Sequence, residues 1–465
     1  MSAPAVWVFF PIALGGLLIL LRNQRLITLL AGMACVLLAL TALLLPIDTS
    51  HTIGSLTFRL NPSFEMLGRR LTLADHDRAW LALLYGASAF WFLAASSIQI
   101  ARRLIPLGLV ITGLLVAALA VEPFLYAALL IETAVLLAVP LLSPPDRKPG
   151  KGVLRFLIYQ TLAMPFILFS GWLLSGIEAN PGDLALVARA AALLGLGFAL
   201  LLAIFPFYTW IPLLAEEVHP YVAGFLLWIF PTVTMFFGLG FLDRYAWLRD
   251  SAALPTILTM VGVLMVVSGG LLAFFQRHLG RMMGYAVMLE SGFSLLGLGL
   301  GGSYGLHTFL LLFTPRLIGL ALWALALSNL KEHDANLTLD GVKGAGRIWS
   351  FSSTSVVLAS LSLAGAPMLA SFPAHQAIWE GLARQSLTLT PWVFLGSLGL
   401  TISAIRVLAS LVSAPDGSPW GARETRSQRV LLLLGWLCLF LLGILPSWVA
   451  AFWARLPALF EHLGQ

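Results

Sequence analysis

Long apolar runs, separated by charged residues, proline or glycine, follow one another from residue 5 to residue 450. A helix needs roughly 20 apolar residues, at a rise of about 1.5 Å each, to cross the hydrocarbon core of a bilayer. The pattern therefore predicts an all-α integral membrane protein with about 14 transmembrane helices. In order, the runs cover residues 5–21, 26–46, 78–98, 104–121, 123–143, 153–177, 184–220, 221–243, 253–275, 280–301, 305–329, 351–384, 391–413 and 429–450.

Two of these runs are too long for one straight helix and contain helix breakers in their middle. The seventh run carries Pro206 and Pro212, and the twelfth carries Gly365, Pro367 and Pro373. Proline removes a backbone hydrogen bond and clashes with the preceding turn. A broken helix is stable in lipid only where the freed backbone faces protein or a wet cavity.

A single proline would indicate only a kink, but two similar interruptions indicate an internal repeat. We expect spans four to eight to repeat as spans nine to thirteen. Residues 205–220 and 365–374 should form non-helical breaks near the middle of the membrane. The organisation expected is residues 1–103 for the first three helices, 104–243 and 253–413 for the two repeats, and 414–465 for the last loop and helix.

Composition agrees with this interpretation and excludes other classes of protein. Hydrophobic residues make up 59% of the chain and charged residues 10%, with a mean hydropathy of +0.94. Soluble domains contain about 25% charged residues. Cys35 and Cys438 lie inside apolar runs, so no disulfide framework is expected. A cleavable signal peptide is not expected either, because Arg22 and Arg25 follow the first apolar run instead of preceding it.

The net charge of +6 is a matter of topology, because the basic residues lie in short loops and do not form a nucleic-acid-binding patch. One set of alternating loops carries fifteen basic residues, and the other set carries seven. We therefore expect the first set in the cytoplasm and both termini outside. The richer set is Arg22, Arg25, Arg102, Arg103, Arg147, Lys148, Lys151, Arg277, Arg281, Lys331, Lys343, Arg347, Arg423, Arg426 and Arg429. The poorer set is Arg59, Arg69, Arg70, Arg244, Arg249, Arg384 and Arg455.

The longest segment predicted to lie outside, residues 47–77, contains one stretch that alternates polar and apolar residues, from Thr52 to Leu60. Alternation of this kind is typical of a β-strand. We expect a small hairpin there.

Two carboxylates lie at membrane depth, where an ionisable group costs at least about 2.5–3.5 kcal/mol. Glu132 is in the middle of the fifth span, and Glu290 lies ten residues into the tenth. If the repeat holds, these two spans correspond. Each carboxyl is either a proton-binding group, whose pKa burial would raise, or a neutral group held by one hydrogen bond. We expect both side chains to face the interior of the bundle.

Further polar candidates lie near the two breaks. His375 follows the second break and can exchange a proton near neutral pH, or it is a neutral histidine bound to a carbonyl. Arg316, directly after Pro315, would fix a positive charge. Arg406 and Arg189 would do likewise, extend to the membrane surface or form a structural pair. The loop after the first break has three titratable residues that are either solvated or form a proton uptake point: Glu216, Glu217 and His219.

The sequence contains no metal-binding cluster, nucleophile triad, phosphate loop, haem signature or flavin signature, so no cofactor and no covalent chemistry of its own are expected. The chemistry open to the buried residues is ion movement. In the predicted second repeat, four spans contain Glu290, Arg316, His375 and Arg406, of which Glu290 and His375 are titratable. We therefore expect conduction through the C-terminal half, with His375 as the switching group.

Four ordered motifs resemble one family. FPFYTWIPLLAEEVHP (205–220) resembles PFHxWLPDAxxxAPT, and LGRMMGYAVMLESGF (279–293) resembles DLKRLLAYSSIxHxG. LDGVKGAGR (339–347) and LSLAGAPMLASFPAHQAIWEGL (361–382) are similar to LDDLAGLGRR and SLAGIPPLAGFxGKF. These motifs belong to the antiporter-like subunits of respiratory complex I, the NADH:quinone oxidoreductase chains of N, M or L type. Mrp antiporter and membrane-bound hydrogenase subunits are related to them.

The resemblance covers nearly the whole chain and implies fourteen helices with inverted repeats around two broken helices. It also implies a proton path through a central chain of charged groups, in a bacterial-type cell membrane and among other membrane subunits. Glu132 matches the family's glutamate of the fifth span. The family's lysines of the seventh and eighth spans have no counterpart, because no lysine occurs between residues 152 and 330. Glu290 replaces a histidine, Arg316 stands where relatives have lysine, and His375 falls on or beside a lysine or glutamate position.

Three functions fit these observations. The first is a proton-translocating subunit of a complex I-type redox pump. The second is a divergent transport module in a cation antiporter, hydrogenase or inorganic-carbon uptake complex. The third is a scaffold subunit that conducts no protons. The absence of lysines in the first repeat favours a scaffold role for that half, whereas Glu290 and His375 favour conduction in the other half. The ion, proton or sodium, and the redox partner stay open.

Overall fold

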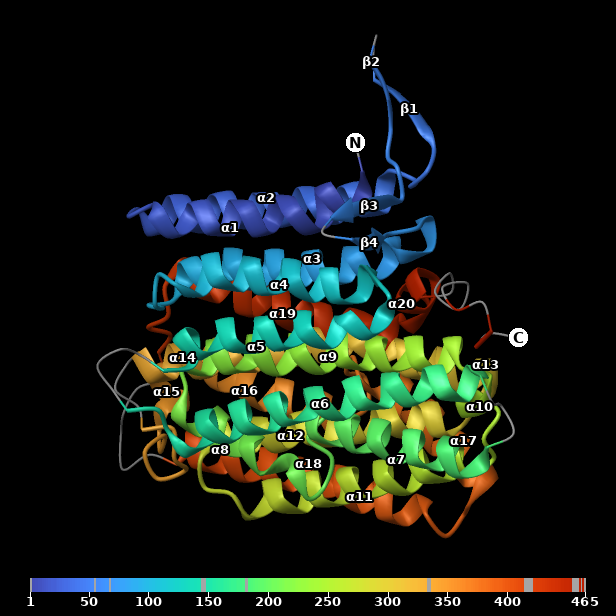
Figure 1. Cartoon of the computed structure of the whole chain (residues 1–465). Helices are drawn as coiled ribbons and strands as arrows, with labels where there is room; N and C mark the ends of the chain where they lie inside the picture. Colours follow the sequence, from blue (N-terminus) through green and yellow to red (C-terminus); the bar gives the residue numbers. More distant parts are fainter. Residues whose placement is uncertain are drawn as a thin grey trace.

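A computed structural model of the chain describes residues 2–53, 56–66, 68–143, 148–179, 183–332, 336–413, 421–453, 460 and 462–463. The helices run side by side in one bundle, with α1 and α2 along one edge and α11 along the opposite edge (Figure 1). The predicted all-α membrane architecture is confirmed.

The helices of the N-terminal half follow the predicted apolar runs closely. A π-helical turn (Ala5–Phe9) leads into α1 (Phe10–Leu20), and then come α2 (Gln24–Leu44), α3 (Arg78–Ala94), α4 (Leu104–Ala120) and α5 (Ala127–Leu142). The next helices are α6 (Lys151–Ala179), α7 (Leu184–Leu201), α8 (Trp210–Glu217), α9 (Pro220–Arg244) and α10 (Ala246–Arg249).

The C-terminal half begins with α11 (Ala253–Phe275), α12 (Leu279–Gly299), α13 (Gly302–Leu311) and α14 (Phe313–Glu332). It continues with α15 (Ala345–Ile348), α16 (Ser350–Leu363), α17 (Phe372–Gln385), α18 (Thr390–Val412), α19 (Arg426–Ile444) and α20 (Pro446–Trp453). Among the described residues, eleven helical segments are long and apolar enough to cross a membrane. Three shorter apolar helices, Ala5–Leu20, Leu104–Ala120 and Ser350–Leu363, accompany them.

Two small antiparallel sheets lie at one end of the bundle. β1 (Ser50–Ile53) pairs with β2 (Leu56–Arg59), so the hairpin predicted between Thr52 and Leu60 is confirmed, and it projects away from the helices (Figure 1). A second sheet, which the sequence did not predict, joins β3 (Ser63–Met66), β4 (Arg69–Thr72) and β5 (Val121–Glu122).

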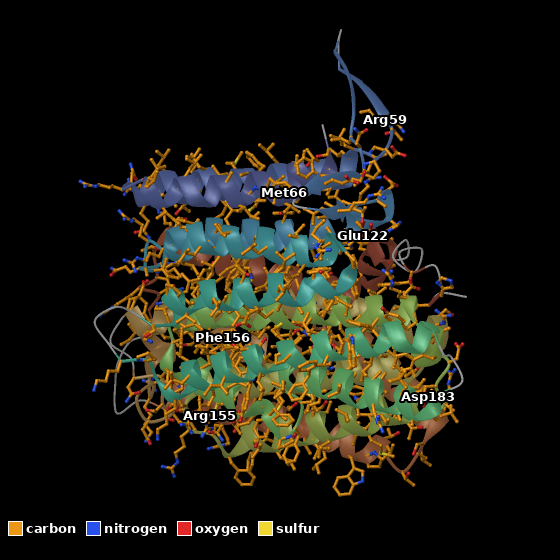
Figure 2. All side chains as sticks on the ribbon, viewed as in Figure 1. Arg59, Met66, Glu122, Arg155, Phe156 and Asp183 are labelled. Carbon is orange, nitrogen blue, oxygen red and sulfur yellow. The ribbon has the colours of Figure 1, made fainter. Side chains whose placement is uncertain are left out.

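The two ends of the bundle differ in what they carry. The marked chain ends, the strands, α10 and α20 lie at one end, and α8 and α15 lie at the other (Figure 1). Asp183, which caps α7, lies at the strand end together with Glu122, whereas Arg155 of α6 lies toward the opposite end (Figure 2). We call the end with α8 and α15 the basic end, because its loops carry most of the basic residues counted above. Arg147 and Arg455 of that count lie outside the described residues.

The first break separates α7 from α8. Residues 202–209 interrupt the helix, Ala203 has a positive φ of 54°, and Phe207–Thr209 forms a 3₁₀ turn. The prediction of a break at Pro206 is confirmed, but the predicted non-helical range of 205–220 is wrong for Trp210–Glu217, which forms α8. Pro212 is tolerated there because the first-turn N–H groups of a helix have no intrahelical partner.

The second break separates α16 from α17. Residues 364–371 interrupt the helix, one residue earlier than predicted at the start and three residues earlier at the end. The break ends early because Pro373 occupies the second position of α17, where a helix accepts proline. Gly365, with φ of 81°, and Met368, with φ of 66°, provide the reversal of the chain.

The basic end of α8 is attached to three other helices. Arg281 Nε of α12 donates to Glu216 Oε2 at 2.6 Å, and Gly152 N of α6 donates to Glu217 Oε2 at 2.8 Å. Tyr221 N donates to His219 Nδ1 at 3.4 Å, which makes His219 the N-cap of α9. These contacts hold the C-terminal end of α8 against α6, α12 and the start of α9.

His219 accepts this hydrogen bond only while its Nδ1 carries no proton. Burial, and then the positive charge of Lys331, lower the pKa of His219 from 6.5 to about 4. The folded protein therefore favours the neutral imidazole. The stabilisation is complete above pH 6.5 and is lost as the pH falls toward 4.

We expect the substitution His219→Asn to remove this part of the pH dependence. Asparagine is a good N-cap and does not titrate. Wild type should lose up to about 3 kcal/mol between pH 6.5 and 4 through this group, and the variant should lose less. Thermal unfolding of the detergent-solubilised protein from pH 7.5 to 4 tests this. Parallel curves for wild type and variant would contradict it.

We expect Gly365→Ala to destabilise the protein more than Gly301→Ala. Both glycines have positive φ, 81° and 73°, which costs another residue about 1–2 kcal/mol. A Cβ at Gly301 meets nothing within 4 Å, whereas one at Gly365 lies 2.5 Å from Nδ1 of His375. Unfolding midpoints of the two variants measure the difference. Equal midpoints would show that the His375 ring moves freely away from the added methyl group.

Candidate functional site

Glu290, Arg316 and His375 meet in the interior of the bundle. The carboxylate of Glu290 lies between two basic side chains: Oε2 is 3.5 Å from Nε of Arg316, and Oε1 is 3.2 Å from Nε2 of His375. The three side chains are 0%, 2% and 0% exposed. We call these three residues the buried triad. The sequence named all three, and the structure brings them together from α12, α14 and α17.

Neighbouring groups fix the position of the arginine and of the histidine. Arg316 donates to the backbone carbonyl of Glu290 at 2.6 Å and also to the hydroxyl of Ser294, and it contacts the Met235 sulfur at 3.5 Å. The His375 ring stacks on Phe293, with the ring centroids 3.7 Å apart and the planes 12° apart. The imidazole is therefore held with one nitrogen toward Glu290.

Irregular backbone places two of the triad residues. The predicted span 305–329 divides at Leu312 into α13 and α14, and Pro315 and Arg316 lie in the first turn of α14. His375 lies in the first turn of α17, directly after the second break, and its N–H donates to the Ser371 carbonyl at 3.0 Å. The interruption at Leu312 and the second break therefore bring Arg316 and His375 next to Glu290 in the middle of α12.

Proton exchange is the chemistry that this arrangement allows. Arg316 supplies a fixed positive charge, and the imidazole of His375 has two ring nitrogens, one of which can accept a proton while the other donates one. Nε2 of His375 is directed at a carboxylate, and its Nδ1 is buried without a hydrogen-bond partner among the described residues. A proton that arrives on one ring nitrogen can thus leave from the other toward Glu290.

Glu132 is not equivalent to Glu290 in its surroundings. It is half-buried on α5 and accepts a hydrogen bond of 2.8 Å from Thr161 of α6, whose own side chain is exposed. The expectation that both carboxylates face the interior is confirmed for Glu290. Glu132 is only half-buried, although its Oε2 is buried without a hydrogen-bond partner among the described residues. The Glu132–Thr161 pair lies at the contact between α5 and α6.

The other two arginines named from the sequence lie apart from the triad. Arg406 of α18 donates to the carbonyl of Phe274, and its guanidinium lies 5.3 Å from that ring. It thus neutralises the negative C-terminal end of α11. Arg189 is exposed on α7. Neither of the two contacts of Arg406 involves a triad residue.

The possible uptake point of Glu216, Glu217 and His219 lies at the basic end, where each of its members has the structural partner described above. His278, the N-cap of α12, lies close to them and accepts from Gly280 N at 3.2 Å. Burial lowers the pKa of His278, as do Arg281 and Lys331, while Glu216 opposes the shift. Burial, with a smaller contribution from nearby cations, therefore favours neutral histidines at this end.

Two polar residues that matter at these sites were missed from the sequence. Ser294 follows Glu290 by four residues, a spacing that puts both on one helix face and could have indicated its contact with Arg316. Gln160 of α6 is 1% exposed and donates to the Leu201 carbonyl at 3.1 Å, which satisfies the backbone freed at the first break. Its depth inside an apolar run was the available signal. Among the described residues, no group of three His, Cys, Asp or Glu side chains could hold a metal ion.

Known proteins resemble this chain over most of its length. NAD(P)H-quinone oxidoreductase chain 4-2 from a Synechocystis species is 28% identical over 290 residues, which cover 57% of this chain and 50% of that protein. NADH-quinone oxidoreductase subunit N 2 from Acidobacterium capsulatum is 28% identical over 72% of this chain and 71% of its own. Subunit 14 from Thermus thermophilus is 27% identical, with coverage of 70% and 73%. The chain spans about half the length of the cyanobacterial relative.

Solved structures share the fold at lower identity. A chain of respiratory complex I from Thermus thermophilus with bound NADH has a TM-score of 0.76 at 20% identity, covering 97% of this chain and 99% of that one. Chains of the Mrp complex from a Dietzia species and of an archaeal membrane-bound sulfane sulfur reductase each have a TM-score of 0.81 at 15% identity. Each of these two comparisons covers 98% of this chain and 97% of the other.

A family profile described as NADH:quinone oxidoreductase/Mrp antiporter, transmembrane, matches residues 157–402, which is more than half of the chain. The match includes both breaks and all three residues of the buried triad. The resemblance carried by the four sequence motifs is confirmed, and the chain belongs to the NADH:quinone oxidoreductase/Mrp antiporter transmembrane family.

Proposed function

We propose that this chain is a proton-translocating, antiporter-like membrane subunit of a complex I-type redox pump, and that protons cross it through its second repeat. The observation that carries the proposal is the buried triad, in which a titratable histidine, a carboxylate and an arginine are in mutual reach at membrane depth. Placing such groups inside a membrane costs free energy, and where they occur they mark ion pathways. Family membership and the names of the relatives, quinone oxidoreductase subunits, agree with it.

In this proposal, His375 alternates between two charge states. When it is protonated, the carboxylate of Glu290 has two cationic neighbours; when it is neutral, Arg316 alone balances Glu290. Arg316 sets the field and carries no proton itself. Redox work in another subunit changes which state is lower in free energy, and the proton moves when the state changes. The chain itself makes and breaks no covalent bond other than those to the proton.

The proposal includes fourteen membrane crossings. Residues 1–103 provide three, 104–243 and 253–413 provide five each as inverted repeats, and 414–465 provide the last. The eleven long and three shorter apolar helices support this number. With the basic end in the cytoplasm, both termini lie on the outer side of a bacterial-type cell membrane.

Other membrane subunits are the partners in this proposal, because the structural neighbours belong to multi-subunit membrane complexes. The half-buried Glu132 supports a partner contact on the α5–α6 side. A carboxylate at membrane depth is too expensive to face lipid. A subunit that covers this side would shield the Glu132–Thr161 pair and extend the polar path to its neighbour.

A second role, as a scaffold without conduction, is favoured for the first repeat by one observation. The break between α7 and α8 is satisfied by Gln160, an uncharged side chain that cannot carry a proton at neutral pH. Neither α7 nor α9 contains a lysine. The first repeat would then keep the shape of the family without its charged centre.

We expect His375→Ala and Glu290→Gln each to lower proton uptake at least tenfold. Uptake is measured in inside-out membrane vesicles that contain the whole complex, driven by its respiratory substrate. Each change removes one of the two titratable groups of the triad. Thr232→Val is the matched control: Thr232 is buried in α9 of the first repeat, and its hydroxyl binds only the Trp228 carbonyl of its own helix.

Glu290→Gln leaves Arg316 buried without a counter-charge, which destabilises proteins by about 3–5 kcal/mol. The double variant Glu290→Gln, Arg316→Gln removes both charges and keeps the test valid if the single variant does not assemble. Unchanged uptake in a His375→Ala, Glu290→Gln variant would refute conduction through the triad. The scaffold role would then apply to the whole chain.

A further inference from the structure

Glu424 is a buried carboxylate that neither the sequence motifs nor the triad explains. It precedes α19 at the basic end and is 2% exposed, although Arg423, Thr425 and Arg426 beside it are exposed. Its Oε1 accepts a hydrogen bond of 3.0 Å from Ser352 N, in the first turn of α16. Its Oε2 is buried and has no hydrogen-bond partner among the described residues. The carboxylate therefore lies just below the surface, and its Oε2 is free to accept a hydrogen bond.

A chain of buried polar groups extends from this carboxylate. Ser352, whose N–H binds Glu424, accepts through its hydroxyl from Asn329 Nδ2 of α14 at 3.4 Å. Asn329 Oδ1 in turn accepts from Gln428 Nε2 at 3.2 Å, and Gln428 also donates to the Ser97 carbonyl at 3.0 Å. Ser352, Asn329 and Gln428 are 0%, 1% and 3% exposed. A dry helix interface would not need so many polar side chains at one place.

Hydroxyl groups continue along one face of α16 toward the triad. Ser352, Ser355 and Ser362 are spaced by three and seven residues, which puts them on one side of the helix. Ser355 Oγ donates to the Phe351 carbonyl at 2.8 Å and accepts from Trp436 Nε1 at 2.7 Å. Ser362 Oγ is buried without a hydrogen-bond partner among the described residues. Ser362 follows Ser352 by ten residues, which is about 15 Å along the helix axis.

The inner end of this face lies at the triad. α14 and α16 pack against each other in opposite directions: Asn329 meets Ser352 at the basic end, and Gly319 meets Leu363 at the inner end. Gly319 follows Arg316 by three residues. Ser362 precedes Gly365 by three residues, and a Cβ at Gly365 would lie 2.5 Å from Nδ1 of His375, so this nitrogen faces Gly365. The polar face of α16 thus leads from Glu424 to the side of His375 that does not face Glu290.

We propose that Glu424 is the proton-accepting group of an inlet that follows Ser352, Ser355 and Ser362 to Nδ1 of His375. The inlet rests on the function proposed above. A proton from water at the basic end binds the Glu424 carboxylate, passes along the α16 hydroxyls and the waters that they bind, and reaches Nδ1. The imidazole then releases a proton from Nε2 toward Glu290. Proton number and charge balance at each transfer, and no other reactant is needed.

A purely structural role for Glu424 predicts different behaviour. As the acceptor of Ser352 N, the carboxylate would only hold the loop before α19 to the start of α16. Glutamine can accept the same hydrogen bond and has nearly the same volume, but it does not titrate. The variant Glu424→Gln therefore separates the two roles, and Glu424→Asp restores a titratable group.

The experiment uses the intact complex in inside-out vesicles and compares proton uptake per substrate oxidised. We expect Glu424→Gln to lower uptake about tenfold, Glu424→Asp to restore much of it, and Ser362→Ala to lower it severalfold. Ser360→Ala is the matched control for Ser362→Ala, because Ser360 is also buried in α16 but its hydroxyl binds only the Val357 carbonyl of its own helix. Unfolding midpoints of the solubilised complex should be unchanged in Glu424→Gln.

The outcomes distinguish the inlet from the function on which it rests. Wild-type uptake in either Glu424→Gln or Ser362→Ala, together with loss of uptake in His375→Ala, would overturn the inlet and leave the proposed function intact. A lower unfolding midpoint in Glu424→Gln at wild-type uptake would assign Glu424 the structural role. Wild-type uptake in His375→Ala would overturn both proposals.

Discussion

The charge of Arg316 at the centre of the bundle is the constraint on which the rest of the C-terminal half depends. A guanidinium cannot lose its proton in a protein, so its burial has to be offset by acceptors. Glu290 contributes a carboxylate and a backbone carbonyl, Ser294 a hydroxyl, and Met235 a sulfur. The break before α17 then brings His375 to the other oxygen of Glu290. An unbroken helix through residues 364–371 would continue past this point and bring no polar residue to the carboxylate.

The two broken helices solve the same backbone problem with different chemistry. Each is interrupted at a proline, and each break contains one non-glycine residue with positive φ, Ala203 in the first and Met368 in the second. Glu132 of the N-terminal half is half-buried. At the first break, the neutral amide of Gln160 satisfies the Leu201 carbonyl. In the second, the charged groups meet next to the break. Similar shape with unequal charge means that only one half has a titratable centre among its described residues.

The sequence predicted the parts of the structure that depend on composition and on local backbone chemistry. The lengths of the apolar runs predicted the helices, and the proline positions predicted the two breaks. The alternation of polar and apolar residues predicted the β1–β2 hairpin. Pro212 misled the prediction because it suggests a helix end, whereas in the first turn of α8 its missing N–H is harmless. The triad residues were found because charge inside an apolar run is conspicuous at any position.

Facing directions and loop contacts could not be predicted in the same way. A single sequence does not say which side of α5 faces a neighbour, so it did not predict that Glu132 would be only half-buried. Glu216, Glu217 and His219 looked like solvated loop residues, yet each holds a helix end through one hydrogen bond. Glu424 escaped notice for a related reason. It stands among arginines in a loop, where a carboxylate is normally solvated, and only the packing of α14, α16 and α19 buries it.

Helix α12 connects the two halves of the molecule at two levels. Near the basic end, Arg281 pairs with Glu216 of α8, directly after the first break. Nine residues further along, about 14 Å at helical rise, Glu290 pairs with Arg316 and His375 beside the second break. A packed helix moves as a rigid element. A displacement of α12 that tightens or loosens one ion pair therefore acts on the other. Helix α12 therefore links the buried triad of the C-terminal half to α8 of the N-terminal half. The ion pair of Arg281 with Glu216 is one point of that link and is partly exposed, whereas the two ion pairs of Glu290 are buried.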